Sequence, residues 1–362
     1  MVTIDGSMGE GGGQVLRTSL GLSLVTGEPF RIENIRAGRP KPGLMRQHLT
    51  AVRAAAEVSG AKVSGDAIGS RRLEFEPGQV RAGQYEFAVG TAGSATLVLQ
   101  TVLPALMVAA GPSRLTLRGG THNPWSPPFD FLQRAFLPLL GRMGVKVKAE
   151  LIRPGFYPAG GGEFTVEIEP PAAVAGETPA GRKGGTPSPR LRPLELVERG
   201  EITARRATAI VAKLPEHIAR RELDVVRKKL GWPDESLTAE EARHSAGPGN
   251  ILFIEAQCEH VTEVFTGFGE LNVRAEAVAT KAVEEYRHWL AAGVPVGPRL
   301  ADQLLVPLAM AGAQGTGGRF RTVAPTRHTT TNIEVIRQFL DVRIACAQIE
   351  RGVWEVTAAR QP

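Results

Sequence analysis

One pattern that occurs three times constrains the fold of this chain most. A polar or glycine-rich turn opens an apolar helix that ends in small residues, at 9–27, 90–111 and 299–313. The apolar side chains recur at a spacing near 3.6 residues and glycines stop the runs, which predicts helices. Strand-like sequence follows each run, and each has a candidate partner helix, over 42–61, 126–144 and 332–340. The repeat predicts three similar units, each made of two helices and a sheet.

A change in composition near the middle of the chain indicates two domains. Residues 170–193 are rich in proline and glycine and nearly devoid of large apolar side chains, which is typical of a flexible linker. Residues 194–292 then show strands and helices of their own, and the third unit resumes near Val294. We therefore expect an α+β fold: a large domain over 1–193 and 293–362, interrupted by a small α/β domain over 194–292.

Composition narrows the class of protein. A chain of 362 residues with 42% hydrophobic and 22% charged residues can bury a full core. The amino-terminal sequence lacks the basic and apolar regions of a leader, and no apolar run reaches the length of a membrane span, so a cytoplasmic protein without a membrane partner is expected. Cys258 and Cys346 do not form a CxxC or other spaced cysteine motif, which argues against a zinc site or a disulfide framework.

Positive charge is concentrated in one short segment. The net charge is only +6, but residues 35–49 contain four basic side chains: Arg36, Arg39, Lys41 and Arg46. Such density suits the phosphates of a nucleotide or a nucleic acid, although a solvated basic loop is an open alternative. Arg36 and Arg39 surround a glycine and precede Pro-Lys-Pro, which predicts a rigid turn with forked donors. Gln47 is a further candidate for the site, whereas His48 is more typical of packing or of the surface.

The glycine run "GEGGGQVLR" at 9–17 is a second candidate phosphate site. Backbone N–H groups at the start of a helix lie at the positive end of its dipole and can bind an anion. The run matches neither the Walker A loop nor the dinucleotide fingerprint, and a tight turn without a ligand explains it equally well. Within the run, Glu10 offers an oxygen that could share a magnesium ion with phosphates, and Arg17 follows two turns along the helix.

Among the seven histidines, His328 has the most unusual surroundings. It lies in a hydroxyl-rich turn, "PTRHTTTN", at a predicted helix start with an arginine beside it. Threonine or backbone groups there can orient a neutral imidazole. No metal motif and no serine hydrolase motif accompanies it. One hypothesis is therefore a nucleophile whose Nε2 atom attacks phosphorus.

Six ordered motifs carry a family resemblance. They are "DGSMGEGGGQVLRTSLGLS", "IRAGRPKPGLMRQHLTAV", "GSATLVLQTVLPAL", "GFYPAGGGEF", "ADQLLVPLAMAGA" and "HTTTNIEVIRQFL". Together they closely resemble the RNA 3′-terminal phosphate cyclase family, from the first residues to about residue 345, with 170–193 as a local expansion. The resemblance implies a large domain of three units, each with two helices on a four-stranded sheet, and a small inserted α/β domain.

The resemblance also implies a reaction in three steps. A histidine attacks the α-phosphorus of ATP and expels diphosphate, the AMP moves to an RNA 3′-phosphate, and the vicinal 2′-hydroxyl closes a 2′,3′-cyclic phosphate and releases AMP. His328 stands at the position of the adenylylated histidine. ATP, a divalent metal (magnesium or manganese) and RNA with a 3′-phosphate end are the implied cofactors and partner; the oligomeric state is left open.

Further site residues are implied by similarity. Arg17, Arg36, Arg39 and Gln47 would hold the RNA and nucleotide phosphates, Glu10 the metal, and Gln100 the nucleotide, with Asp302 near His328; Pro127 and Phe131 would stack on adenine, with Phe265 a weaker candidate. The chain has Arg299 where relatives often have an aromatic residue. The adenine wall is thus expected to be built differently, although arginine can also stack on a base.

Two other functions stay open on the sequence alone. A cyclase-like protein of ribosomal RNA processing resembles the same family but binds without catalysis and lacks the histidine. An enolpyruvyl transferase shares the helix-pair and sheet architecture and also holds phosphate with basic side chains. In addition, the basic helix predicted over 215–231 either contacts RNA or is a solvated amphipathic face.

Overall fold

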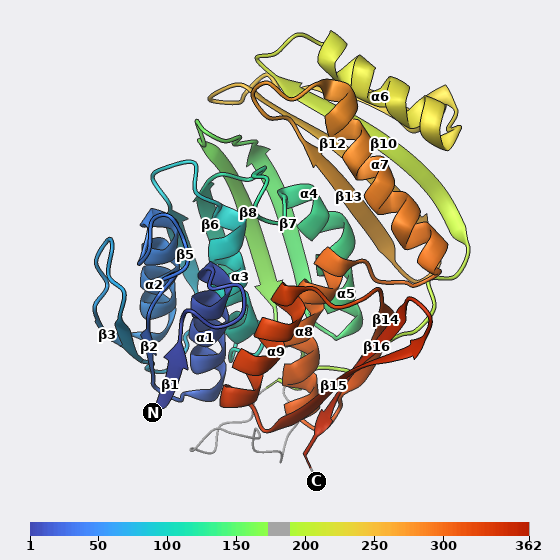
Figure 1. The fold of residues 1–362 in the computed structure, drawn as a ribbon. Helices are drawn as coiled ribbons and strands as arrows, with labels where there is room; N and C mark the ends of the chain where they lie inside the picture. Colours follow the sequence, from blue (N-terminus) through green and yellow to red (C-terminus); the bar gives the residue numbers. More distant parts are fainter. Residues whose placement is uncertain (173–188, 362) are drawn as a thin grey trace.

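The part of the chain that the structure describes forms four four-stranded sheets and the helices that cover them (Figure 1). The structure, a computed structural model, describes residues 1–172 and 189–361. Three sheets belong to units with one connectivity, strand–helix–strand–helix–strand–strand, and one strand order, first–second–fourth–third. This confirms the predicted α+β fold with three repeated units. In the described part of the chain, no helix has the length and apolarity needed to cross a membrane.

The first unit shows how the sequence produces this connectivity. Its elements are β1 (Val2–Asp5), α1 (Gly13–Thr26), β2 (Phe30–Glu33), α2 (Arg46–Ser59), β3 (Lys62–Ser64) and β4 (Leu73–Glu76). Strands β1 and β2 pair in parallel, which requires a crossover, and α1 supplies it. Gly27 and Gly60 end the two helices at φ of 77° and 66°, a left-handed conformation that favours glycine, as the glycine stops predict.

The second unit differs from the prediction in its second helix. Its elements are β5 (Gln84–Ala88), α3 (Ala95–Leu106), β6 (Ser113–Gly119), α4 (Phe129–Phe131), η1 (Leu132–Phe136), α5 (Leu137–Arg142), β7 (Lys146–Arg153) and β8 (Gly162–Glu169). The helix expected over 126–144 is thus interrupted by the π-helical stretch η1. Pro138 explains this, since it has no N–H to donate to the carbonyl four residues earlier.

The third unit is interrupted after its first strand. Its elements are β9 (Leu194–Leu196), α8 (Pro298–Ala313), β14 (Gly318–Thr322), α9 (Arg327–Phe339), β15 (Val342–Glu350) and β16 (Val353–Arg360). The short strand β9 pairs in parallel with β14, with Leu194 opposite Gly318 and Leu196 opposite Phe320. The expected division at residue 194 differs from this pairing, because residues 194–196 belong to the third sheet. The expected linker over 170–193 lies largely outside the described residues.

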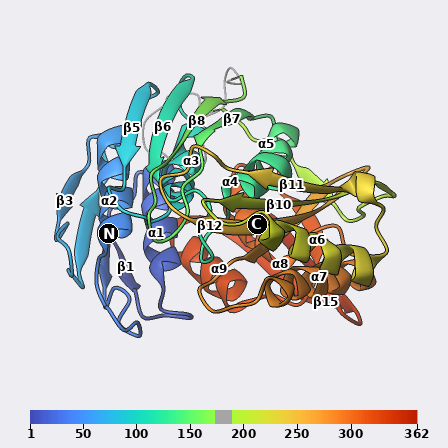
Figure 2. The same cartoon turned by 90° about the horizontal axis from the view of Figure 1, so that it is seen from above.

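The fourth sheet lies between two helical layers. The insert consists of β10 (Ile202–Ala212), α6 (His217–Leu230), η2 (Asp234–Ser236), β11 (Leu237–Glu241), β12 (Gly249–Cys258), β13 (Thr262–Phe268) and α7 (Ala275–Ala292). Seen from above, α6 and α7 lie on one side of its sheet and α4 and α5 on the other (Figure 2). Along β12, Ile251 and Phe253 join the core of the three units, whereas Leu252 and Ile254 join the core under α6 and α7. Because successive side chains of β12 point to opposite faces of the sheet, both faces are buried.

Helix α1 lies at the centre of the large domain. It contacts α2, α3 and α9, and ten of its fourteen residues are buried, which explains why it is apolar nearly all round. The Thr18 hydroxyl donates a buried hydrogen bond of 2.7 Å to Asn332 Oδ1 of α9, and Gln14 contacts His328 one turn earlier in both helices. The two helices therefore run in the same direction. Their amino-terminal ends, which carry two of the predicted motifs, therefore lie side by side.

Candidate active site

His328 is the second residue of α9, which begins at Arg327 rather than near 332 as predicted. The helix starts early because Thr326 caps it: Thr326 Oγ1 accepts from the Thr329 N–H at 3.1 Å, and the Thr326 N–H donates to Thr329 Oγ1 at 3.2 Å. This capping box satisfies two of the free groups at the helix start. The imidazole is consequently fixed at the positive end of a helix dipole.

The glycine turn 9–13 packs directly against α9. Gly9 adopts φ of 59°, and a side chain there would collide with Thr331. This close approach places Glu10 Oε2 3.0 Å from His328 Nε2 and Gln14 Oε1 2.9 Å from His328 Nδ1. The imidazole is therefore held at both ring nitrogens by residues more than 300 positions earlier in the chain.

Glu10 and His328 form a charged pair. The hydrogen bond to Glu10 raises the pKa of His328 against the effect of burial, and the Glu10 charge adds to it. Burial favours a neutral Glu10, but the hydrogen bond from His328 and the charges of His328, Arg39 and Arg17 outweigh it and lower the pKa of Glu10. Between these two pKa values, the resting site holds a carboxylate beside an imidazolium.

Two of the three predicted arginines reach this pair. Arg39 Nη2 lies 3.3 Å from Glu10 Oε1. Arg17 lies against Gly13 at the start of α1, where burial lowers its pKa to about 10 and the Glu10 charge opposes that shift, so it stays protonated at neutral pH. Arg36 instead closes its own turn, since it donates to the carbonyls of Lys41 and Gly43 at 2.7 and 2.9 Å.

His48 also lies at the glycine turn, in a buried position. It packs against Gly13 and Arg17, in agreement with the packing interpretation of the sequence. Burial, together with the charges of Arg17 and Arg36, lowers the pKa of His48 to about 3, so His48 is neutral. Its Nδ1 accepts from the Met45 N–H at 3.2 Å, which leaves the proton on Nε2, beside Gly13.

Asp302 supports the start of α9 from α8. Its Oδ1 accepts from Thr329 Oγ1 at 2.6 Å and from Thr326 Oγ1 at 3.3 Å. Burial raises the pKa of Asp302 to about 6, against the hydrogen bond from Thr329 and the charge of His328. Asp302 thus contacts the threonines on either side of His328 and positions the turn that carries it.

The two predicted glutamines join neighbouring helix starts. Gln47, in the first turn of α2, accepts from the Ser94 N–H at 2.7 Å, at the N-cap of α3. Gln100, one and a half turns along α3, donates to Gln303 of α8. The helices α2, α3 and α8 therefore share polar contacts at the same end of the domain as the turn that carries His328.

The three predicted adenine-binding residues lie in different surroundings, and two of them are buried in cores. Phe131 is buried in the large core, and Phe265 packs under α7 with its ring centroid 5.7 Å from Tyr286 and 5.5 Å from Trp289. Pro127 is half-buried, and its carbonyl accepts from Thr96 Oγ1 at 2.8 Å near the start of α3. Only Pro127 of the three lies both partly exposed and next to the helix that carries Gln100.

Arg299, the departure from the family pattern, points toward the insert. It donates to Thr266 Oγ1 and pairs with Glu285 at 3.1 Å. With Phe265 and the buried Glu263, it lines a cavity of about 260 Å³ beside the start of α8. Glu263 accepts from the Gly297 N–H at 2.8 Å and so caps α8.

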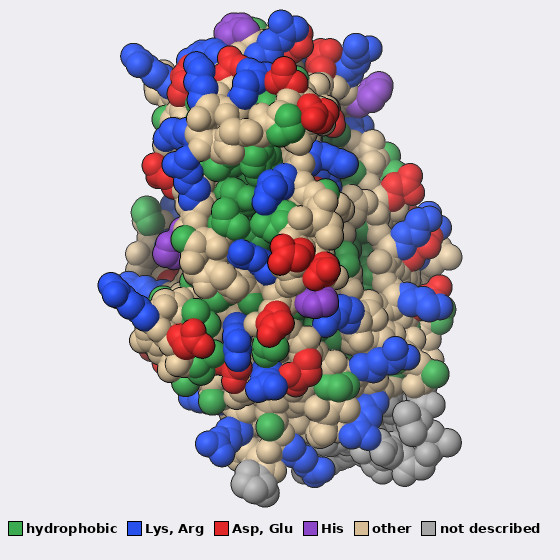
Figure 3. All heavy atoms as spheres, turned by 90° about the vertical axis from the view of Figure 1, so that its right-hand side faces the viewer, with side chains coloured by type: hydrophobic (Ala, Val, Ile, Leu, Met, Phe, Trp, Pro, Cys, Tyr) green, Lys and Arg blue, Asp and Glu red, His purple; other side chains and the backbone are tan. Residues whose placement is uncertain are grey.

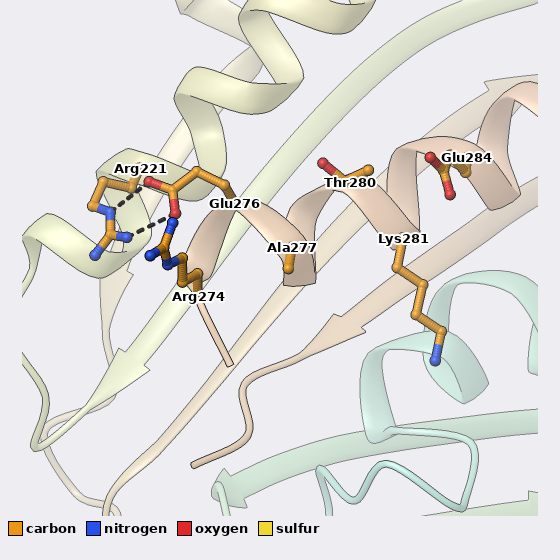
Figure 4. Close-up of a pocket in the computed structure, with 7 residues that line it drawn as sticks. All are labelled: Arg221, Arg274, Glu276, Ala277, Thr280, Lys281 and Glu284. Atoms are coloured by element: carbon orange, nitrogen blue, oxygen red, sulfur yellow. Dashed lines mark hydrogen bonds and ion pairs between the residues drawn. The ribbon is translucent and has the colours of Figure 1, made fainter. Parts of the chain in front are cut away.

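A larger groove of about 570 Å³ lies on the outer helices of the insert (Figure 4). Arg221 and Glu276 form an ion pair of 2.7 Å at one end of it and neutralise each other, while Lys281 and Glu284 point apart. Other basic side chains of α6 are paired in the same way, Arg220 with Glu216 and Arg227 with Asp234. This favours the solvated amphipathic face for α6. Basic and acidic side chains are also interspersed on the neighbouring face of the molecule (Figure 3).

Sequence reasoning missed Gln14 and Thr329. Gln14 holds His328 Nδ1, and Thr329 links the cap of α9 to Asp302. A glutamine in the first turn of a helix has no motif of its own. The available signal was its position, one helical turn after Glu10 and one before Arg17, which places the three on one side of the helix start.

A histidine held at both nitrogens, beside a glycine-rich helix start and two guanidinium groups, is typical of proteins that transfer phosphate-containing groups. The family model of RNA 3′-terminal phosphate cyclase matches residues 8–346. Relatives with that name are 51% identical over 355 residues in Ectopseudomonas mendocina, 52% over 350 in Koribacter versatilis and 46% over 352 in Salmonella typhimurium. These matches cover 97% or 98% of this chain and 93% to 97% of the relatives. The chain belongs to the RNA 3′-terminal phosphate cyclase family.

Proposed function

We propose that this protein is an ATP-dependent cyclase that converts the 3′-phosphate end of RNA into a 2′,3′-cyclic phosphate in the cytoplasm. The observation that carries the proposal is the contact of His328 with Glu10 and Gln14, inside a family whose members are named for this reaction. A cyclase-like protein that only binds RNA would lack this histidine. An enolpyruvyl transferase would have no use for a nucleophile there.

In the first step, His328 becomes covalently bonded to AMP. Gln14 fixes Nδ1, so Nε2 is the nitrogen that attacks. The imidazolium loses its Nε2 proton to solvent, and the freed electron pair forms the bond to the α-phosphorus of ATP while diphosphate leaves; Glu10 Oε2, 3.0 Å from Nε2, orients the ring. A phosphorus bonded to nitrogen is reactive enough to pass its AMP to the next acceptor.

In the later steps, the RNA end becomes an electrophile. An oxygen of the 3′-phosphate attacks the α-phosphorus and breaks its bond to Nε2. The 2′-hydroxyl oxygen then attacks the terminal phosphorus and loses its proton to water, and the phosphoanhydride bond breaks so that AMP leaves. Negative charge accumulates around phosphorus throughout, and Arg17 and Arg39, with Arg36 and Gln47 nearby, supply fixed positive charge and donors.

Glu10 is also the residue that would hold a divalent ion. The described residues contain no group of three side chains of ligand type, so the donor set fits an ion that takes most of its ligands from nucleotide phosphates and water. Such an ion supplies charge neutralisation on the leaving diphosphate. For nucleotide recognition, Gln100, Pro127, Phe131 and Phe265 remain proposed contacts, with Asp302 near the ribose or phosphates.

The test of this function is the fate of an RNA 3′-phosphate. Incubation with ATP and magnesium or manganese is expected to convert the end to a form that phosphatase does not remove. Omission of ATP is the control, since cyclisation has no leaving group without AMP. An end that stays sensitive to phosphatase under every metal would contradict the proposed reaction.

Adenylylation is expected to depend on pH through His328. Attack requires a neutral Nε2, so the labelling rate rises with pH through the raised pKa of His328. Glu10→Gln removes the charge that raises this pKa, and the midpoint of the rising limb shifts to lower pH. Single-turnover labelling from about pH 6 to about pH 9 measures the midpoint, and NMR of the His328 ring without ATP or metal measures it independently of activity. If the midpoint is the same in wild type and Glu10→Gln, the charge of Glu10 is not what raises the pKa of His328.

A further inference from the structure

Two aromatic side chains are unusually exposed on the second unit. Trp125 is 76% exposed and Tyr157 is 56% exposed, and no other aromatic residue is among the exposed large hydrophobic residues of the described chain. Their ring centroids are 5.7 Å apart and their planes are at 79°, an edge-to-face pair. An edge-to-face pair with this exposure leaves ring surface open to solvent. Exposed indole and phenol rings that lie together indicate a contact surface.

The loop that carries Trp125 is fixed to the start of α3. Asn123 Nδ2 donates to the Ala92 carbonyl at 2.7 Å, and the Pro127 carbonyl accepts from Thr96 Oγ1 at 2.8 Å. These two hydrogen bonds lie on either side of Trp125. The indole is therefore held outward from a loop that is itself anchored at both ends.

Tyr157 comes from the turn between β7 and β8, which packs on the same segment. A side chain at Gly160 would come within 2.8 Å of the Ala92 Cα atom, so glycine allows this close approach. The segment continues into Ser94, whose N–H donates to Gln47 in the first turn of α2. The start of α3 thus connects the aromatic pair to Gln47, which follows the arginine turn in the first turn of α2.

Two exposed basic side chains lie at the turn that carries Tyr157, and one of them, Arg153, is also 3.9 Å from Glu163 Oε2. Arg153 Nε donates to the Gly161 carbonyl at 2.7 Å, and Lys213 Nζ donates to the Ala246 carbonyl at 2.9 Å. Gly161 and Ala246 are in contact, so both exposed cations border the turn that carries Tyr157. Open aromatic faces next to cations are the arrangement with which proteins bind single-stranded RNA, because bases stack on the rings while phosphates meet the charges.

We propose that Trp125 and Tyr157 form a stacking platform for the bases just upstream of the RNA 3′-phosphate. The inference rests on the proposed function, because it takes RNA as the occupant of the neighbouring phosphate site. Stacking is tolerant of base identity, so the platform orients the end of many RNA sequences. The platform also predicts a preference for an unpaired 3′ end, since paired bases present no free face.

The test uses a labelled single-stranded RNA of about ten nucleotides with a 3′-phosphate, bound without ATP or metal. Trp125→Ala is expected to raise the Kd about tenfold, and Trp125→Phe to recover most of the affinity. With a second probe whose last few nucleotides lack bases, wild type and Trp125→Ala are expected to bind equally. Leu271→Ala, which removes a side chain that is 92% exposed on the insert, is the matched control and leaves the Kd unchanged.

Three outcomes would overturn the platform: equal Kd values for wild type and Trp125→Ala, a loss that persists with the abasic probe, or a change in self-association without a change in RNA affinity. The proposed function is tested separately by transfer of label from α-labelled ATP to the wild-type protein, which needs no RNA. A protein that takes no label but shows the base-dependent loss keeps the platform and loses the cyclase assignment. The reverse result rejects the platform alone.

Discussion

Replacement of His328 by alanine is expected to abolish both the covalent labelling of the protein by ATP and the cyclisation of RNA ends. The imidazole Nε2 supplies the electron pair that displaces diphosphate, and alanine supplies none. Loss of a catalytic nucleophile lowers turnover by on the order of 10³-fold or more. Denaturing electrophoresis after incubation with α-labelled ATP measures the first loss, and resistance of the RNA end to phosphatase measures the second.

His217→Ala is the matched control for this experiment. His217 is exposed at the start of α6, on the outer layer of the insert, so its loss changes neither reaction. His328 is half-exposed, with its ring bonded to Gln14 and Glu10 rather than packed in a core, so the alanine variant is expected to fold. Full labelling of the His328→Ala protein would assign the nucleophile to another residue and would reject the mechanism.

Replacement of Arg17 by alanine has the second largest expected effect. Arg17 lies under the glycine turn beside Gly13, and it keeps its charge at neutral pH because its pKa is about 10. Removal of a preorganised donor from a site where charge develops lowers kcat/KM by about 10²- to 10³-fold. Steady-state cyclisation, with ATP and RNA varied in turn, shows which phosphate the residue serves.

Arg31→Ala and Arg17→Lys make this prediction specific. Arg31 on β2 pairs with Glu74 at 2.8 Å, and its removal makes the same change in net charge without affecting the site. Lysine at position 17 restores the charge but not the forked donors, so partial recovery is expected. A loss of equal size in Arg17→Ala and Arg31→Ala would show that net charge, and not the position of Arg17, sets the rate.

Helices could be predicted from the sequence where buried apolar side chains recur at helical spacing along one stretch of chain. Apolar periodicity places α1, α3 and α8, because these helices are largely buried along their whole length. The start of α9 was placed too late because threonines are poor helix formers, and their stabilisation comes from Thr326 and from Asp302 on another helix. The strand β9 was missed because it has three residues and its partner β14 is far away in the sequence.

The candidate site was predictable only in part. Glu10 contacts His328, at the start of another helix, and Arg39, in the turn before α2. Local sequence does not show that Gln14 reaches His328, 314 residues away, because that contact depends on how α1 and α9 pack. Equally, no pattern predicts that the Arg36 guanidinium is engaged by carbonyls of its own turn.

The position of the insert inside the third unit has a consequence for how the chain folds. During synthesis, β9 emerges from the ribosome long before β14, so its sheet has to wait for a partner 124 residues later, the separation between Glu195 and Arg319. A folded insert shortens the effective loop between β9 and β14, because its entry and exit are already joined: Arg199 lies over the Trp289 ring at 4.8 Å and donates to the Leu290 carbonyl. The entropic cost of closing the third sheet is then that of a short loop. An insert that assembles first would act as a template for completing the unit that carries the nucleophile.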